Sequence, residues 1–193
     1  MNIRTVGFIL SALLISMMIV MMVKSNVEEP NSIVDLRVET NSIIPAEKSG
    51  LKIGETPPDF ELSTISGDMV KLSDLKGQKV ILNFWTSWCT WCKSEMPHME
   101  KYYKNYQESS NVEIIAVNLT ESERQGLKGI QRFIDVFGLT FPIPLDIDGK
   151  VDKAYGIVSI PTTYMIGTNG EIGQIINGPM DEKSLKSFVD NLE

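Results

Sequence analysis

The two cysteines of the chain stand at a spacing that permits reversible disulfide chemistry. Cys89 and Cys92 are the only cysteines among the 193 residues, and two residues separate them. An apolar run over 80–85 leads into the pair, and a helical pattern of apolar residues follows it. Cys89 would then stand at the start of a helix. There the free N–H groups and the helix dipole stabilise a thiolate, so we expect the pKa of its thiol to lie below the usual value of about 8.5.

This arrangement predicts thiol–disulfide exchange. Cys89 would attack a substrate disulfide, and Cys92, one helical turn further on, would resolve the mixed disulfide. A purely structural disulfide over so short a gap would close too small a loop to stabilise the chain much. A structural zinc ion usually has four ligands, and the chain has no second cysteine pair and a single histidine, His98. A metal-binding or metallochaperone domain that uses these three residues is the non-enzymatic alternative.

The helix predicted after the cysteines has one apolar face and extends to about residue 106. Members of this face recur at spacings of three and four, and they are Cys92, Met96, Met99, Tyr103 and Tyr106. Pro97 falls inside this segment, where it removes one backbone hydrogen bond, so a kink is expected there. Core packing explains the methionines and tyrosines better than any cofactor role.

The segment 84–93 resembles the active-site segment of thioredoxins. It is most similar to the membrane-anchored, extracytoplasmic thiol–disulfide oxidoreductases of the TlpA/ResA type. Pro97 stands where that family has a helix-kinking proline, and 160–162, Ile-Pro-Thr, matches its cis-proline loop, which faces the C-x-x-C. The resemblance covers about residues 50–193.

The resemblance implies an α/β fold of the thioredoxin type, with a central mixed β-sheet flanked by helices and an N-terminal β-hairpin extension. It also implies that Trp88 flanks the cysteines, and that Ile160 and Pro161 hold an extended substrate segment by main-chain pairing. Glu95 is similar to an acidic residue that tunes the cysteines in ResA-like members. The residues alone leave Glu95 open between a pKa-tuning or proton-shuttling role and an ordinary solvated carboxylate.

The remaining segments agree with a sheet covered by helices. A hairpin is predicted over 57–72, with a helical turn after it that Ser73 caps. Strands and helices then alternate, with a right-handed crossover between the first two parallel strands. The expected strands span 80–85, 112–118, 162–166 and 171–177, and the expected helices include one ended by Gly138, a short one capped near Asp146 and a last one capped by Asp181.

The chain divides into an anchor at 1–24, a stalk at 25–49 and the redox domain at 50–193. Residues 6–23 carry no charge and would span roughly 27 Å as a helix, close to the thickness of a bilayer core. A cleaved signal peptide is the alternative, but no small-x-small cleavage site follows the run. The N-terminal amine and Arg4 precede the run, and Lys24 follows it, with Glu28 and Glu29 after that. We expect a single-pass transmembrane helix with a cytoplasmic N-terminus and an extracytoplasmic domain.

Composition and resemblance together limit the partners. The net charge of −7 argues against nucleic acid binding. The resemblance implies exported protein thiols or disulfides as substrates, a CcdA-like transmembrane thiol reductant as electron donor, and no cofactor or metal beyond the Cys89–Cys92 disulfide. It favours a reductase, for example in cytochrome c biogenesis. A peroxiredoxin-like thiol peroxidase is the alternative enzyme, since Thr86 stands three residues before Cys89, but Leu82 occupies the place of its proline.

Overall fold

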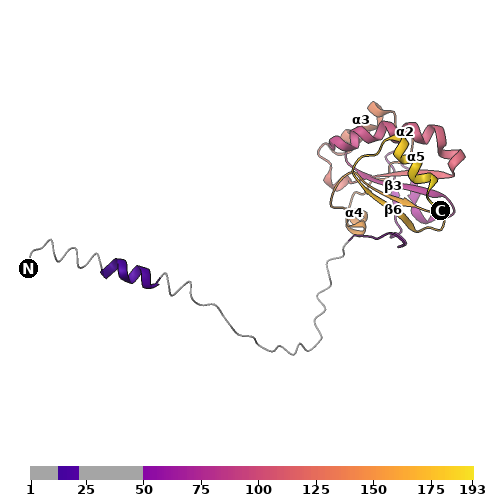
Figure 1. Ribbon diagram of the computed structural model, residues 1–193. Helices are drawn as coiled ribbons and strands as arrows, with labels where there is room; N and C mark the ends of the chain where they lie inside the picture. Colours follow the sequence, from indigo (N-terminus) through magenta and orange to yellow (C-terminus); the bar gives the residue numbers. More distant parts are fainter. Residues whose placement is uncertain (1–12, 22–49) are drawn as a thin grey trace, which may run out of the picture. The chain divides into compact units, whose positions relative to one another are not determined.

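The computed structural model describes residues 13–21 and 50–193 (Figure 1). Residues 13–21 form an apolar helix inside the predicted anchor. The rest of the anchor, 1–24, and the predicted stalk, 25–49, lie outside the described residues. Within the described ranges, no helix is both long enough and apolar enough to cross a membrane.

A four-stranded mixed sheet forms the centre of the domain, in the order β4-β3-β5-β6. β3 (Lys79–Trp85) pairs in parallel with β4 (Val112–Asn118) and antiparallel with β5 (Thr162–Ile166), and β6 (Ile172–Asn177) forms the antiparallel edge. Every residue of β3 after Lys79 is buried, as expected for a central strand covered on both faces. The predicted strands and the mixed sheet are thus confirmed.

Successive residues of β3 point into two separate cores, since side chains alternate along a strand. Ile81 and Trp85 join the core under α2 (Thr90–Ser110), α3 (Gly126–Phe137) and α5 (Glu182–Asp190). Leu82 and Phe84 join the core under α4 (Lys150–Tyr155) and the hairpin. Three helices therefore cover one face of the sheet, and the short helix with the hairpin covers the other (Figure 1).

The N-terminal hairpin is present as a separate two-stranded sheet, in which β1 (Glu61–Ser63) pairs antiparallel with β2 (Met69–Lys71). The short 3-10 helix η1 (Leu72–Leu75) follows it. The prediction that Ser73 caps this turn is wrong, because no side chain caps it. Instead the N–H of Ser73 donates to Oδ1 of Asp59 at 2.9 Å, which ties the turn to the preceding segment.

The helix after the cysteines, α2, continues through Pro97 to Ser110, four residues beyond the predicted end. Cys92, Met96 and Met99 are buried as predicted, but the buried tyrosine of the next turn is Tyr102. Tyr103 is only partly buried, because its hydroxyl reaches out to donate to Glu113 at 2.9 Å. Tyr103 and Tyr106 still pack against this core from its edge, so the predicted face is confirmed except that it missed Tyr102.

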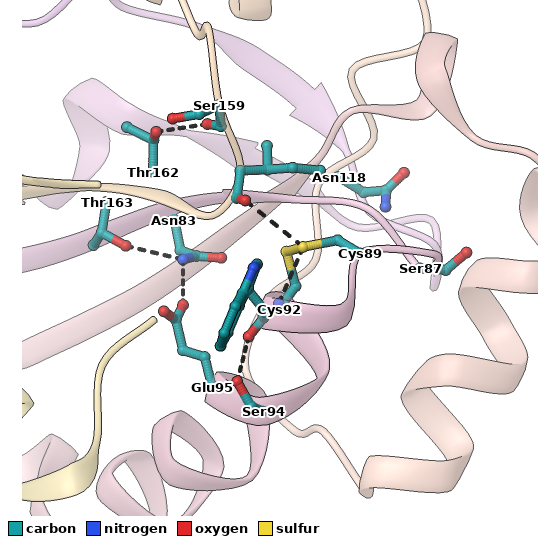
Figure 2. Close-up of a disulfide and its surroundings, with 12 residues drawn as sticks. Asn83, Ser87, Cys89, Cys92, Ser94, Glu95, Asn118, Ser159, Thr162 and Thr163 are labelled. Atoms are coloured by element: carbon teal, nitrogen blue, oxygen red, sulfur yellow. Dashed lines mark hydrogen bonds between the residues drawn. A yellow bond between two sulfur atoms is a disulfide. The ribbon is translucent and has the colours of Figure 1, made fainter. Parts of the chain in front are cut away.

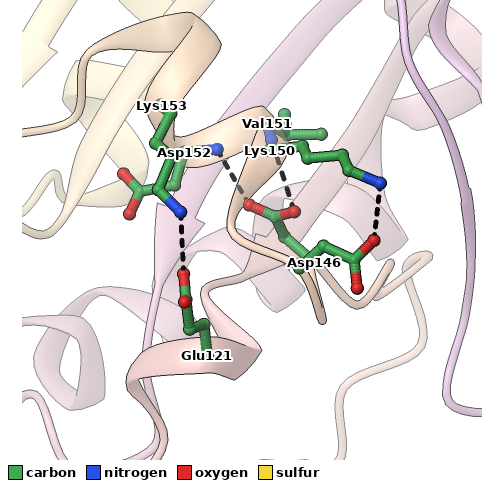
Figure 3. A network of polar contacts seen from close by, with 7 residues as sticks. Glu121, Asp146, Lys150, Val151, Asp152 and Lys153 are labelled. Atoms are coloured by element: carbon green, nitrogen blue, oxygen red, sulfur yellow. Dashed lines mark hydrogen bonds and ion pairs between the residues drawn. The ribbon is translucent and has the colours of Figure 1, made fainter.

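The short helix α4 is anchored by the buried carboxylate of Asp146. Its two oxygens accept the N–H groups of Val151 and Asp152 at 3.3 and 2.8 Å (Figure 3). The prediction that a turn at 146–149 caps this helix is thereby confirmed, with Gly149 as the N-cap residue. The predicted caps at the other two helices also hold: Asp181 accepts from the N–H of Ser184, and Gly138 ends α3 with φ of 61°.

Candidate active site

The Cys89–Cys92 pair lies where β3 passes into α2. Cys89 is the N-cap residue of α2, and Cys92 lies in its first turn. The two sulfurs form a disulfide, with Cα atoms 5.3 Å apart (Figure 2). Cys89 is 5% exposed and Cys92 is fully buried, so an incoming group reaches the disulfide at Cys89.

The helix start creates a site for negative charge at Cys89. The N–H of Cys92 donates to Sγ of Cys89 at 3.0 Å, so the sulfur takes the place of the side-chain oxygen of an ordinary N-cap. The first turn of α2 contains no acidic residue that would oppose an anion there. A thiolate on Cys89 is therefore stabilised by a backbone N–H and by the helix dipole.

The loop before β5 faces the disulfide. The Ile160–Pro161 peptide bond is cis, and the carbonyl oxygen of Ile160 lies 3.8 Å from Sγ of Cys89. Thr162 Oγ1 donates to the carbonyl of Ser159 at 2.7 Å, which holds the ends of the loop together. The structure thus brings Ile160 and Pro161 next to Cys89, as the resemblance implied.

Glu95 lies on α2, one turn beyond Cys92, and it is fully buried. The interpretation as a solvated carboxylate is therefore wrong. Asn83 Nδ2 donates to one of its oxygens at 2.6 Å (Figure 2). The N–H of Met180 donates to the other at 3.0 Å. Burial nevertheless raises the pKa of Glu95 to about 8, since the loss of hydration outweighs these two hydrogen bonds, which lower the pKa.

Asn83 and Thr163 complete the polar cluster beneath the disulfide. They are directly paired residues of β3 and β5, and Asn83 Nδ2 donates to Thr163 Oγ1 at 2.9 Å. Neither residue was predicted as part of the site. Two signals pointed to Asn83: it is a polar residue inside the apolar run of β3, which indicates a buried hydrogen-bonded group, and the TlpA/ResA type commonly has asparagine at this place.

Trp88 lies beside the cysteines, partly buried against the segment that follows β4. Its Nε1 donates to the carbonyl of Ser122 at 3.0 Å, and the guanidinium carbon of Arg124 lies 4.1 Å from the centre of its ring. A cation at this distance is attracted by the quadrupole of the aromatic ring, so the contact stabilises the position of both side chains. Trp88 is thus held in place by residues more than thirty positions away in the chain.

Glu123 fixes the active-site loop, although no sequence pattern predicted it. Its carboxylate accepts both the N–H and the hydroxyl of Ser87, each at 2.6 Å, and the amide of Asn118 at 2.8 Å. Ser87 is two residues before Cys89, so Glu123 holds the chain just ahead of the N-cap. No local pattern reveals such a contact, because it joins two loops 36 positions apart.

Replacing Glu123 with alanine is expected to lower the free energy of unfolding by about 2–3 kcal/mol. The reason is that three hydrogen bonds to a charged carboxylate are lost at once. Urea denaturation of the oxidised full-length protein measures this change. Glu121→Ala is the matched control, because its exposed pairing with Lys153 at 3.4 Å should contribute below about 1 kcal/mol. Equal losses in the two variants would contradict the anchoring role.

The histidine considered as a metal ligand, His98, lies exposed on α2. Within residues 13–21 and 50–193, no group of three or more His, Cys, Asp or Glu side chains is arranged to hold a metal ion.

A C-x-x-C disulfide at a helix start, opposite a cis-proline loop on a mixed sheet, defines the class of thioredoxin-like thiol–disulfide oxidoreductases. The chain belongs to the AhpC/TSA family, whose model matches residues 53–175. It is 40% identical over 147 residues to the thiol-disulfide oxidoreductase ResA of Geobacillus thermodenitrificans, covering 76% of this chain and 82% of that protein. The protein is accordingly an enzyme, a ResA-like thiol–disulfide oxidoreductase.

Two further relatives come from Bacillus subtilis. The thioredoxin-like protein YneN is 41% identical over 141 residues, covering 73% of this chain and 81% of the relative. The crystal structure of StoA superposes with a TM-score of 0.61 at 40% identity, covering 68% of this chain and 96% of that chain. The predicted resemblance to the ResA type is thus confirmed.

Proposed function

We propose that the protein reduces disulfides in exported proteins, in cytochrome c maturation or a similar envelope process. The observation that carries the proposal is the placement of Cys89. Its sulfur is the reachable end of the disulfide, caps a helix and faces the carbonyl of Ile160 at 3.8 Å. A thiolate stabilised in this way is both an effective nucleophile and a good leaving group.

The reaction begins with the reduced pair. The Cys89 thiolate attacks one sulfur of the substrate disulfide, the substrate S–S bond breaks, and one substrate thiolate leaves and takes up a proton. Cys92 then loses its proton and attacks Sγ of Cys89, which releases the second substrate thiolate. The substrate gains two electrons and two protons, and the protein ends in the Cys89–Cys92 disulfide form.

Glu95 serves the second step in this proposal. Because its pKa is raised to about 8, most of the molecules hold Glu95 protonated at neutral pH. It lies one helical turn from Cys92 in a site without exposure to water. We assign it to setting the pKa of Cys92 and to exchanging the proton that Cys92 gains and loses.

The substrate segment would lie along the cis-proline loop. Ile160 is partly exposed beside Cys89, and its main chain would pair with an extended segment that carries the substrate disulfide. Pro161 holds this backbone, and Trp88 flanks the cysteines from the other side.

We place the domain outside the cytoplasmic membrane, held by an anchor at 1–24 and a stalk at 25–49. The uncharged run 6–23 and the distribution of charge around it support this placement. A CcdA-like transmembrane protein would supply electrons, because a reductase outside the cytoplasm needs a source of thiols.

The reduction potential of the full-length protein tests the direction of electron flow. Equilibration with dithiothreitol or glutathione is expected to give a value near that of thioredoxin, about −270 mV, because such a pair reduces most other disulfides. A value near that of DsbA, about −120 mV, would make the protein an oxidant and overturn the proposal. A peroxide-consumption assay distinguishes the thiol peroxidase alternative from the proposed reductase, since a reductase should leave peroxide largely intact.

A further inference from the structure

A groove of about 450 Å³ lies beside the reactive disulfide, between the start of α2 and α3. Its apolar part is formed by Trp88, Phe133, Val136 and Phe137. Gly129 lets α3 approach the active-site loop, since a Cβ atom there would lie 3.3 Å from the Ser87 hydroxyl and 2.7 Å from Cβ of Gln125. The groove therefore borders the loop that presents Cys89.

Three cationic side chains, Lys93, Arg124 and Arg132, line this groove, and no carboxylate lines it. All three are exposed, and none of them forms an ion pair with another described residue. The chain as a whole has a net charge of −7, so this local positive charge is opposite to that of the molecule. Arg124 packs on the Trp88 ring and Arg132 donates to Gln125, but neither charge is neutralised by a carboxylate. Cations gathered in one groove without carboxylate partners attract an anionic ligand.

The dipole of α3 does not account for the cations near the start of this helix, of which Arg124 lines the groove. Arg124 stands just before the helix, and Lys128 lies in its first turn, where the helix dipole is positive. Cations at this end weaken a helix, and the first turn of α3 contains no acidic residue to offset them. The charge of Arg124 is thus unfavourable to the dipole of α3, and its local contact is with the Trp88 ring.

We propose that this groove binds an acidic segment of the exported substrate, next to the disulfide that Cys89 attacks. The inference rests on the proposed reductase function and adds the substrate class. Arg124 and Arg132 would each receive a carboxylate, which guanidinium groups bind through paired hydrogen bonds, and Lys93 would add a third positive charge. Phe133, Phe137 and Trp88 would contact apolar side chains of the same segment.

Two disulfide peptides of otherwise identical sequence test the proposal. Each contains one internal disulfide, and three glutamates flank it in the first peptide, three lysines in the second. The reduced full-length protein is mixed with each peptide, and acid-quenched samples are separated by chromatography to give second-order rate constants. We expect the glutamate peptide to react about tenfold faster at low ionic strength. The ratio should approach one in about 1 M salt, where charges are screened within about 3 Å.

Two double variants test whether the preference for the glutamate peptide arises in the groove. Arg124→Gln combined with Arg132→Gln should bring the ratio of rate constants close to one. Lys71→Gln combined with Lys76→Gln removes the same charge at exposed positions near the other end of β3, and it should leave the ratio unchanged.

The possible results distinguish failure of the groove proposal from failure of the proposed reductase function. If neither peptide is reduced, the proposed function fails along with the groove. If both are reduced at equal rates, or if the arginine variant keeps the full preference, the groove proposal alone is overturned. If the lysine control loses the preference for the glutamate peptide to the same extent, the preference comes from net charge, and the groove proposal is also overturned.

Discussion

Full-length protein with Cys92 replaced by serine should accumulate as a mixed disulfide with its substrates. Cys89 retains its helix-start position and still attacks, but no second thiol remains to displace the substrate. Since Cys92 is fully buried, no external thiol takes its place from that side. Incubation of the reduced variant with a disulfide-bonded peptide, followed by electrophoresis without reductant, should show most of the protein as an adduct.

The reciprocal variant is the control for this assignment. Cys89→Ser should form no adduct and show no exchange above background, because the remaining thiol is inaccessible at its position in α2. Adducts on Cys89→Ser with none on Cys92→Ser would reverse the two roles. The absence of adducts on both variants would contradict the exchange mechanism itself.

Glu95→Gln is expected to remove a large part of the pH dependence of stability. The pKa of Glu95 is about 8 in the folded protein and about 4.3 for an unfolded glutamate. At pH values between these two pKa values, Glu95 is protonated in the folded state and ionised in the unfolded state. Its contribution to the free energy of unfolding is therefore fully present below about pH 4. It is lost as the pH rises to about 8, at up to about 1.4 kcal/mol per pH unit.

Urea denaturation of the oxidised protein at several pH values measures this effect, because the cysteines do not titrate in the disulfide form. The Glu95→Gln substitution should flatten the decline between about pH 5 and pH 8. Glu108→Gln, at an exposed position of the same helix, should retain the wild-type decline. If Glu95→Gln has the same decline as wild type, Glu95 does not have the raised pKa.

The same substitution tests the role of Glu95 toward the thiols. An ionised Glu95 opposes a thiolate one turn away, so Glu95→Gln should lower the pKa of Cys92 by about one pH unit. Alkylation rates of the reduced protein as a function of pH give this value. An unchanged titration would remove Glu95 from the mechanism.

The sequence predicted the fold well where the pattern is local. The strands Val112–Asn118 and Thr162–Ile166 match their predicted bounds, and the placement of Cys89 at the helix start follows from the same kind of pattern. The anchor and stalk stay predictions.

Contacts between distant segments were harder to predict. Glu95 was left undecided because a carboxylate near the start of a helix is usually solvated, and its burial depends on Asn83 and Met180, which lie outside α2. Glu123 and Arg124 reach the active site only because the segment after β4 folds back beside Ser87 and Trp88. Such contacts follow from tertiary packing, on which a single sequence carries little information.

The three tryptophans of the protein stand at every third position leading into and through the active site. Trp85 is fully buried against Phe133, Trp88 is partly covered, and Trp91 between the cysteines is 65% exposed. A disulfide quenches the fluorescence of a neighbouring indole by accepting an electron from its excited state. All three indoles therefore lie in or just before the segment that holds the disulfide, so the tryptophan fluorescence should differ between the oxidised and reduced forms.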